Sequence, residues 1–266
     1  MPNVNTDRFA GFAELYDSVR PQPPHKVVEI AGKILGREHV EAVADIGSGT
    51  GLSTRIWTQF SSRVVGIEPT IDMIERSRLR NPGITFLNTN SYDTTLDARS
   101  VDLVVCSQSF HWMEPSKTLE EVDRILKPEG LFVVYDCQWP VTWYWHAEQA
   151  YSELIRKARS VERSIHELGQ AVVHYPKDRH IDNMRKSAVF AYCGTVLFDN
   201  TEPCDAERFI GIALSQGQVQ DVLKYSPGEL QTEIQILRDA AAKSTAAEMR
   251  VGYTLHFGVK KSRAST

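Results

Sequence analysis

The sequence predicts an α/β protein whose doubly wound, mainly parallel sheet carries helices on both faces. Between about residues 40 and 136, short runs rich in β-branched residues alternate with stretches in which apolar residues recur at helical spacing. The first run leads into a glycine-rich turn at 47–51, and the fourth is almost entirely apolar. Alternation of this kind is typical of right-handed βαβ units, in which helices cover both faces of parallel strands.

The first half of this core contains three expected strands and two expected helices. The first strand runs directly into the glycine turn, and the second ends at Pro69. Asn81-Pro82-Gly83 is a sequence that ends a helix. We expect a strand at 42–46, a helix with Leu52, Ile56, Trp57 and Phe60 on one face, a strand at 63–68, a helix at 71–80 and a strand at 84–87.

The second half of the core adds two strands and a helix. Residues 101–106 are almost entirely apolar after Asp102, as expected for a strand that is covered on both faces. A helix follows and stops at 127–130, before a strand at 131–136. The apolar positions of that helix are Leu119, Val122, Ile125 and Leu126.

The pattern changes beyond residue 136. Residues 139–146 are densely aromatic and 147–170 form an expected helix, which interrupts the alternation and indicates an inserted cap. The alternation resumes with a strand either at 189–193 or at 195–198. Later expected elements are a helix at about 203–215, a helix opened by Ser226-Pro227-Gly228-Glu229, a strand at 253–259 and a frayed tail from Lys260.

Composition favours a small-molecule ligand over a polyanion. Hydrophobic residues make up 42% of the 266 residues and charged residues 24%, as in ordinary folded proteins. The net charge of −4 and the pI near 6.1 give no electrostatic reason to expect a nucleic acid or an anionic membrane as the main partner. We therefore expect a small-molecule substrate, no nucleic acid, no membrane, and a monomer or homodimer.

Cysteine spacing and the N-terminus indicate a cytoplasmic protein. The four cysteines show no C-x-x-C spacing, so neither a zinc site nor a disulfide framework is indicated, and we expect free thiols. The N-terminus lacks the apolar core of a signal peptide, and no apolar run reaches the roughly 18 residues of a membrane span. The cysteines are Cys106, Cys137, Cys193 and Cys204.

The glycine turn predicts a ligand site. Gly47, Gly49 and Gly51 allow a sharp turn that leaves backbone N–H groups and a helix N-terminus facing a ligand. Leu52 stands where a dinucleotide fingerprint has its third glycine, which argues against NAD, and no G-K-[ST] follows as in a phosphate-binding Walker loop. The alternative is that the glycines only tighten the turn.

Two carboxylates beside the turn narrow the choice of ligand. Asp45 ends the first strand, where a carboxylate can pair with the ammonium of an amino acid. Glu68 ends the second strand, where a carboxylate can accept both hydroxyls of a ribose. An amino acid joined to a ribose is half of S-adenosylmethionine.

The ordered set of motifs resembles the class I S-adenosylmethionine-dependent methyltransferases. This resemblance implies a Rossmann-like seven-stranded sheet with one antiparallel strand, S-adenosylmethionine as the cofactor, and methyl transfer as the reaction. It extends over roughly residues 9–136. The segments that carry it are Val43 to Gly51, Gly66 to Pro69, Phe86 to Ser91, Val101 to Val105 and Arg124 to Gly130.

The resemblance also implies a set of cofactor contacts. Asn90 stands where the family usually has an aspartate that binds the adenine amino group, and its carbonyl can still accept from that group. The backbone of Ser91 would hold the adenine ring, with Pro69 and Met73 as apolar walls or as plain core. The cofactor-binding residues expected on the loop and the two strand ends are Asp45, Gly47, Ser48, Gly49, Thr50, Gly51 and Glu68.

The N-terminal segment resembles the lid helix of small-molecule members of this class. Tyr16 and Arg20 would then close over the methionine end of the cofactor, with Arg20 paired with its carboxylate. Phe12 would contact the substrate. The alternative is that Tyr16 is an ordinary helix contact and Arg20 a solvated charge.

The segment after the fourth core strand is the expected acceptor side of the site. It resembles the His-Trp element of the trans-aconitate methyltransferase-like branch, in which Ser107 and Gln108 would contact the cofactor. His111 would bind the acceptor or act as a catalytic base, and Trp112 would contact the substrate. Alternatively, His111 bonds the backbone while Trp112 packs. A carboxylate acceptor needs no base, whereas a hydroxyl or amine acceptor can use one.

Aromatic and basic residues beyond the fifth strand extend the expected acceptor site. Trp139 and Trp143 follow that strand and suit a partly apolar acceptor, although core packing explains each equally well. The basic stretch from His174 to His180 either attracts an acidic acceptor or is a solvated loop. Its histidines show no carboxylate partner pattern, so no metal is expected.

Three domain segments and one leading function follow. We expect an N-terminal lid helix and cofactor-binding core at 1–136, a helical and aromatic cap at 137–188, and completion of the core sheet at 189–266. The expected function is methyl transfer to a small carboxylate or hydroxyl acceptor. The alternatives are a non-catalytic S-adenosylmethionine- or S-adenosylhomocysteine-binding domain and an RNA or protein methyltransferase.

Overall fold

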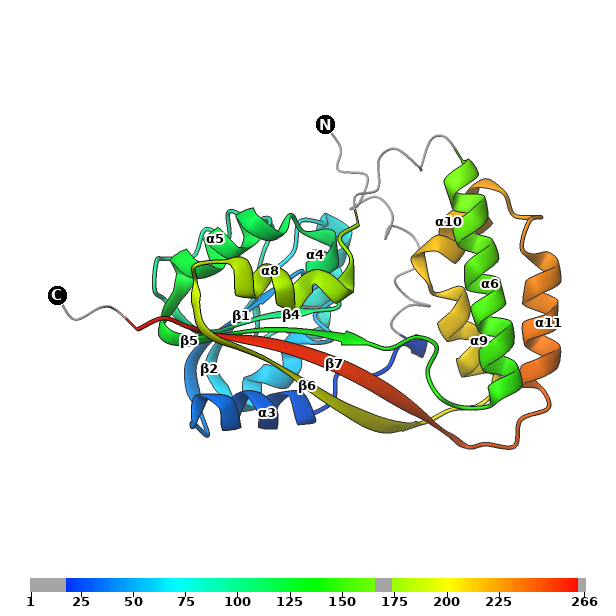
Figure 1. The fold of residues 1–266 in the computed structure, drawn as a ribbon, viewed down its shortest axis with the longest axis horizontal. Helices are drawn as coiled ribbons and strands as arrows, with labels where there is room; N and C mark the ends of the chain where they lie inside the picture. Colours follow the sequence, from blue (N-terminus) through cyan, green and yellow to red (C-terminus); the bar gives the residue numbers. More distant parts are fainter. Residues whose placement is uncertain (1–17, 166–173, 263–266) are drawn as a thin grey trace. The chain divides into compact units, whose positions relative to one another are not determined.

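The computed structural model describes residues 18–165 and 174–262, which divide into two compact units (Figure 1). We call Gln22–Asp136, His174–Leu197 and Thr254–Thr266 the core unit. We call Met1–Pro21, Cys137–Val173 and Phe198–Tyr253 the helical unit. This division differs from the three expected segments by grouping residues 198–253 with the residues after 136.

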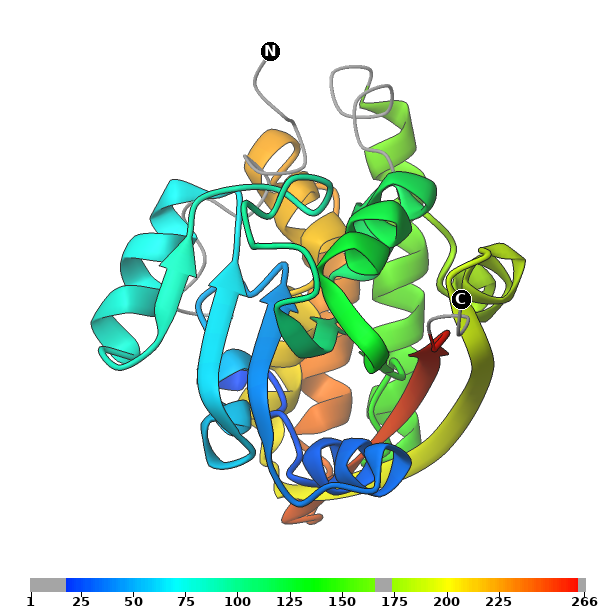
Figure 2. The same ribbon diagram turned by 90° about the vertical axis from the view of Figure 1, so that its left-hand side faces the viewer.

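The strands form one seven-stranded sheet in the order β3-β2-β1-β4-β5-β7-β6, and the predicted fold class is confirmed. The first four neighbouring pairs are parallel, and Figure 2 shows β1 to β3 pointing the same way. Residues 142 and 250 form an antiparallel bridge just beyond β5, so β7 runs against β5. The strands are β1 (Val40–Ile46), β2 (Ser61–Ile67), β3 (Thr85–Leu87), β4 (Val101–Ser107), β5 (Leu126–Cys137), β6 (Phe190–Pro203) and β7 (Glu248–Lys260).

Helices cover both faces of the core sheet. Figure 1 shows α3 on one face and α5 and α8 on the other, so β1 and β4 are buried along nearly their whole length. The helices of the core unit are α3 (Lys26–Leu35), α4 (Ile71–Arg80), α5 (Pro115–Ile125) and α8 (His180–Lys186), with 3₁₀ helices η1 (Thr54–Gln59), η2 (Phe110–Trp112) and η3 (Lys177–Arg179).

Within residues 18–165 and 198–253, the helical unit contains four helices that pack on one another. Helix α6 contacts α9, α10 and α11, and its buried face repeats at helical spacing from Ala147 to Ala158. These helices are α6 (Trp145–Ser164), α9 (Ala206–Leu214), α10 (Gly217–Tyr225) and α11 (Gln231–Ala241).

Several element boundaries differ from the sequence-based expectation. The helix after the glycine turn is the short η1, because β2 already begins at Ser61 and leaves little chain for an α-helix. Strand β5 begins at Leu126, directly after α5. One strand, β6, spans both candidate positions, and Pro227 and Gly228 separate α10 from α11 instead of opening a helix. Helix α6 ends at Ser164 rather than at residue 170.

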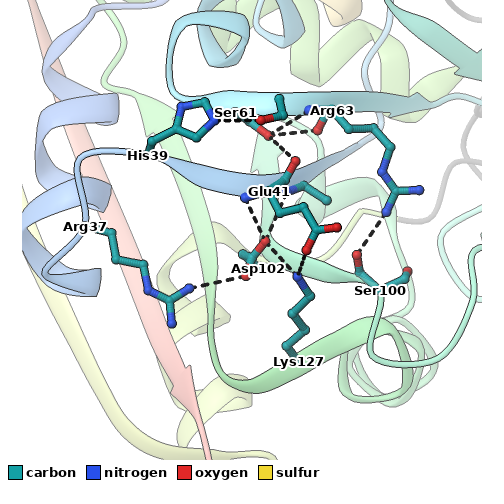
Figure 3. A network of polar contacts seen from close by, with 10 residues as sticks. Arg37, His39, Glu41, Ser61, Arg63, Ser100, Asp102 and Lys127 are labelled. Atoms are coloured by element: carbon teal, nitrogen blue, oxygen red, sulfur yellow. Dashed lines mark hydrogen bonds and ion pairs between the residues drawn. The ribbon is translucent and has the colours of Figure 1, made fainter.

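A buried carboxylate anchors the amino ends of β1 and β4 (Figure 3). Asp102 Oδ2 accepts hydrogen bonds from the backbone N–H groups of Glu41 and Ala42 at 3.1 and 3.0 Å. Lys127 Nζ lies 3.1 Å from the same oxygen, and Arg37 donates to Oδ1 at 3.3 Å. This network lies at the edge of the sheet opposite to the glycine turn, so its role is structural.

Replacing Asp102 with alanine is expected to lower the free energy of unfolding by about 2–4 kcal/mol, because two buried backbone donors and two cations lose their acceptor. Glu41 is a matched control, since its side chain is 75% exposed and it pairs with the same Lys127. Glu41→Gln should change stability by less than about 1 kcal/mol. Urea unfolding followed by circular dichroism measures both, and equal effects would contradict the anchoring role.

Candidate cofactor and active site

The glycine loop joins the carboxyl end of β1 to η1 and has the backbone geometry that requires glycine. Gly47 has φ +73°, and a Cβ there would lie 2.5 Å from the Cβ of Ser109. Gly49 has φ +54°, but a Cβ there would have no atom within 4 Å among the described residues. The loop therefore packs tightly against the segment after β4 at Gly47, whereas none of the described residues crowds its backbone at Gly49.

Asp45 lies at the end of β1 and is completely buried. Its Oδ2 accepts hydrogen bonds from Ser53 Oγ at 2.8 Å and Thr54 Oγ1 at 2.7 Å, whereas Oδ1 has no hydrogen-bond partner in the described part of the chain. Burial raises the pKa of Asp45 to about 6; the Ser53 and Thr54 hydroxyls oppose this shift and the charge of Glu68 adds to it. A buried carboxylate oxygen without a donor is poised to accept from a ligand.

Glu68 lies at the end of β2 and faces the glycine loop. Its Oε2 accepts from the backbone N–H of Gly49 at 3.1 Å, and its Oε1 accepts from the backbone N–H of Thr70 at 2.9 Å. Burial raises the pKa of Glu68, and these bonds oppose the shift. Each oxygen keeps a further lone pair, so this carboxylate can also accept from neighbouring hydroxyls.

The remaining expected cofactor residues of the core unit differ in burial and in hydrogen bonding. The Ser48 hydroxyl is buried without a hydrogen-bond partner among the described residues. Asn90 Oδ1 accepts from the backbone N–H of Tyr92 at 3.0 Å, and the buried Ser91 hydroxyl bonds Thr118 Oγ1 at 2.8 Å. Met73 is buried on α4, Thr50 and Gly51 are buried in the loop, and Pro69 is exposed.

The segment after β4 is tied to the glycine loop. Ser109 Oγ donates to the Ile46 carbonyl at 2.7 Å, and the backbone N–H of Gln108 donates to the Tyr135 carbonyl at 2.9 Å. Gln108 has φ +51°, which is a strained conformation for a residue other than glycine. The half-buried Ser107 and Gln108 and the buried His111 therefore stand at the carboxyl edge of the sheet.

His111 and Trp112 lie in η2, and residues of other segments approach this histidine. The His111 ring lies 4.9 Å from the Trp112 ring and 4.9 Å from the His174 ring, measured between centroids. The backbone N–H of Tyr175 donates to the His111 carbonyl at 2.8 Å. His111 Nδ1 lies 3.6 Å from Oδ1 of the buried Asp136, which ends the core part of β5.

Asp136 also attracts two residues of the basic stretch. Lys177 Nζ lies 2.6 Å from Oδ1, and His180 Nε2 lies 3.7 Å from Oδ2. Burial lowers the pKa of His180 to about 4, although the charge of Asp136 opposes this shift. The sequence pattern offered these histidines no carboxylate partner, and the structure supplies one. Asp136, Ser53 and Thr54 are the residues that the sequence analysis missed.

The other expected site residues belong to the helical unit or are not described. Arg20 is buried, donates to the Ser215 carbonyl at 3.0 Å and lies 5.0 Å above the Trp139 ring. Trp143 Nε1 donates to the Ala246 carbonyl at 3.0 Å. Phe12 and Tyr16 lie outside the described residues.

Comparisons with known proteins place the chain beside methyltransferases. Residues 44–134 match the family model of a methyltransferase domain. An uncharacterized methyltransferase of Mycobacterium bovis is 30% identical over 122 residues, 46% of this chain and 49% of that protein. A Saccharomyces cerevisiae protein named "Probable S-adenosylmethionine-dependent methyltransferase" is 28% identical over 127 residues, 45% of this chain and 43% of that protein. The match spans about half the length of these curated relatives.

A solved structure supports the same fold. The structure of a proposed type II methyltransferase from Anaeromyxobacter dehalogenans has a TM-score of 0.67 at 20% identity, with 92% of this chain and 99% of that chain covered. The fold is that of the Rossmann-like methyltransferases. The matched domain and both relatives are methyltransferases by name, and the name of the Saccharomyces cerevisiae relative adds dependence on S-adenosylmethionine. In the described ranges, 18–165 and 174–262, no helix is long and apolar enough to cross a membrane.

Proposed function

We propose that this chain transfers a methyl group from S-adenosylmethionine to a small molecule with a carboxylate or hydroxyl acceptor. The observation that carries the proposal is the buried Oδ1 of Asp45, which has no partner among residues 18–165 and 174–262. It lies in the loop region of Gly49 and Glu68, where Glu68 accepts from the Gly49 backbone. An ammonium group and a ribose are the ligand groups that these two carboxylates suit. When bound, the cofactor supplies an electrophilic methyl group on a sulfonium.

In this proposal, different residues of the core unit bind different parts of the cofactor. Asp45 pairs with the ammonium, Glu68 accepts the ribose hydroxyls, and the Gly49 backbone lies along the cofactor. Asn90 and Ser91 hold the adenine, with Met73 and Pro69 beside it. Asn90 already accepts one bond from Tyr92, so its carbonyl has one lone pair left for the adenine amino group.

The acceptor side is assigned to the segment after β4. Methyl transfer is an in-line displacement, so much of its catalysis consists of positioning the nucleophile and excluding water. Because His111 Nδ1 faces Asp136, Nε2 is the nitrogen that would accept the proton of a hydroxyl acceptor. Trp112 would form an apolar wall. We extend the proposal to Phe12, Tyr16, Arg20, Trp139 and Trp143 as acceptor or lid residues, to a cytoplasmic location and to a monomer or homodimer without nucleic acid or membrane partners.

A thermal-shift titration tests the cofactor assignment, and a transfer assay tests the activity. S-adenosylmethionine and S-adenosylhomocysteine should each raise the melting temperature in a saturable way. Radiolabelled methyl transfer should then appear with at least one member of a panel of small carboxylates and alcohols. Indifference to both cofactor forms would overturn the proposal, whereas cofactor binding without transfer to any acceptor would favour the non-catalytic binding domain.

Replacing His111 with glutamine separates the two acceptor classes. For a hydroxyl acceptor, kcat should fall by about 100-fold or more, because the base is lost. For a carboxylate acceptor, which is already ionised, kcat should change little. S-adenosylhomocysteine affinity, measured by calorimetry, should stay at the wild-type value in both cases. If this affinity falls in parallel with kcat, His111 acts on the cofactor and not on the acceptor.

The alternative of an RNA or protein methyltransferase is less well supported. The net charge of −4 gives no general attraction to a polyanion, and the resemblance to the trans-aconitate methyltransferase-like branch favours a small acid. The same transfer assay with bulk RNA and with a histone mixture distinguishes these substrates from small acceptors.

A further inference from the structure

Three buried side chains of the core unit form a cluster at the carboxyl edge of the sheet. Asp136 stands near the end of β5, His111 lies in η2, and His180 begins α8. All three are nearly or fully inaccessible to solvent. One potential ligand atom from each lies within 4.8 Å of the other two.

The separations in this cluster suit ligands of one ion better than direct hydrogen bonds. His111 Nδ1 lies 3.6 Å from Asp136 Oδ1 and His180 Nε2 lies 3.7 Å from Asp136 Oδ2, and both distances are too long for hydrogen bonds. Two ligand atoms that each lie about 2.1 Å from one ion in tetrahedral geometry are about 3.4 Å apart. The two imidazoles face different oxygens of Asp136, and the three ligand atoms lie within 4.8 Å of one another, so the side chains need only move slightly closer together to hold one ion.

His180 provides an independent observation. Its side chain is completely buried, and neither ring nitrogen has a hydrogen-bond partner in the part of the chain that the structure describes. A buried polar group without a partner is costly, and native structures pair nearly all such groups with protein atoms, water or an ion. The nitrogen nearest to Asp136, Nε2, is directed at the same carboxylate as His111 Nδ1.

We propose that His111 Nδ1, Asp136 and His180 Nε2 form a binding site for a divalent transition-metal ion of the zinc type. Two imidazoles and one carboxylate are ligands that zinc and its neighbours prefer, and three protein ligands leave one position open. This inference does not depend on methyl transfer. It excludes the base role of His111 while the ion is bound, because an imidazole that binds a metal through Nδ1 carries its proton on Nε2. It replaces the sequence-based expectation of no metal, which rested on the missing carboxylate partner.

Lys177 is the competitor that such a site must accommodate. Its ammonium lies 2.6 Å from Asp136 Oδ1 and would repel a cation bound there. About a third of the Lys177 side chain is exposed, so the ammonium can turn into solvent when an ion binds Asp136. The metal and Lys177 should therefore compete for the same carboxylate. Removal of Lys177 should strengthen metal binding, whereas removal of a ligand should weaken it.

A titration of the full-length, untagged, chelator-treated protein tests the site. Cobalt(II) should bind with one ion per chain and produce visible ligand-field absorption that zinc(II) abolishes. His180→Gln and Asp136→Asn should each weaken the affinity at least about 100-fold. Lys177→Met should strengthen it about tenfold, because a positive charge beside the ion is removed.

His39→Gln is the matched control, since His39 is an exposed histidine of the core unit that bonds Ser62 Oγ outside the cluster. It should bind cobalt as the wild type does. Circular dichroism establishes which variants are folded. If His180→Gln does not fold, the metal affinities of Asp136→Asn and Lys177→Met test the site. No saturable cobalt binding by the wild type, or wild-type affinity in folded Asp136→Asn, would overturn the proposal.

Discussion

Replacing Asp45 with asparagine is expected to weaken S-adenosylhomocysteine binding by about 100-fold, because a buried charged acceptor for the ligand ammonium is lost. Asparagine keeps the size of the side chain and an oxygen for Ser53 or Thr54, so the fold should persist. Isothermal calorimetry measures the affinity. Asp72→Asn, an exposed carboxylate on α4, is the control and should bind as the wild type does.

The pH dependence sharpens this expectation. The pKa of Asp45 is about 6 in the folded protein against an ordinary 3.8, so protonation stabilises the ligand-free fold. This contribution is full below 3.8 and is lost as pH rises through about 6. Cofactor affinity should change in the opposite direction and fall by up to about tenfold per pH unit below about 6, because the ammonium needs the ionised carboxylate. Asp45→Asn should flatten that fall; an unchanged profile would contradict the assignment.

The second large effect is expected at Glu68. Glu68→Gln should weaken S-adenosylhomocysteine binding by about tenfold or more, because one charged oxygen that accepts a ribose hydroxyl becomes an amide donor. Glu75→Gln on the exposed face of α4 provides the control. Adenosine binding separates the causes: the Glu68 variant should lose affinity for adenosine, which has the ribose, whereas Asp45→Asn should bind adenosine normally. Equal losses of adenosine affinity in both variants would show that the loop has collapsed.

Local sequence patterns predicted most elements of the core, because helix-ending residues and apolar runs act over a few neighbouring residues. The helix at 71–80 has its expected ends, since Asn81-Pro82-Gly83 stops it, and the buried strand β4 follows from its unbroken apolar run. The prediction of η1 as a longer helix failed because the available chain length depends on where β2 pairs with β1. Such a limit is tertiary and is not visible in apolar spacing.

The residues of the candidate site that lie at strand ends could be proposed from the sequence, whereas those that depend on tertiary packing could not. Asp45, Glu68 and the glycines follow from their positions at strand ends, where open α/β sheets bind ligands. Ser53 and Thr54 could be found only by knowing that η1 turns back toward Asp45. Asp136 carried a usable signal, since it is a carboxylate near the end of the strand beside the one that precedes His111. Its association with His180 depends on how α8 packs, which no local pattern specifies.

The two units are interleaved along the chain, which has a consequence for biosynthesis and for protein engineering. The boundaries after Pro21, Asp136, Val173, Leu197 and Tyr253 each pass the chain from one unit to the other. Residues 22–136, with the glycine loop and both carboxylates, form one uninterrupted stretch that leaves the ribosome before residues 137–266. The helical unit is complete only after residue 253 has been made. It therefore cannot be exchanged between relatives by a single crossover, and a graft of the whole unit must transplant three separate segments.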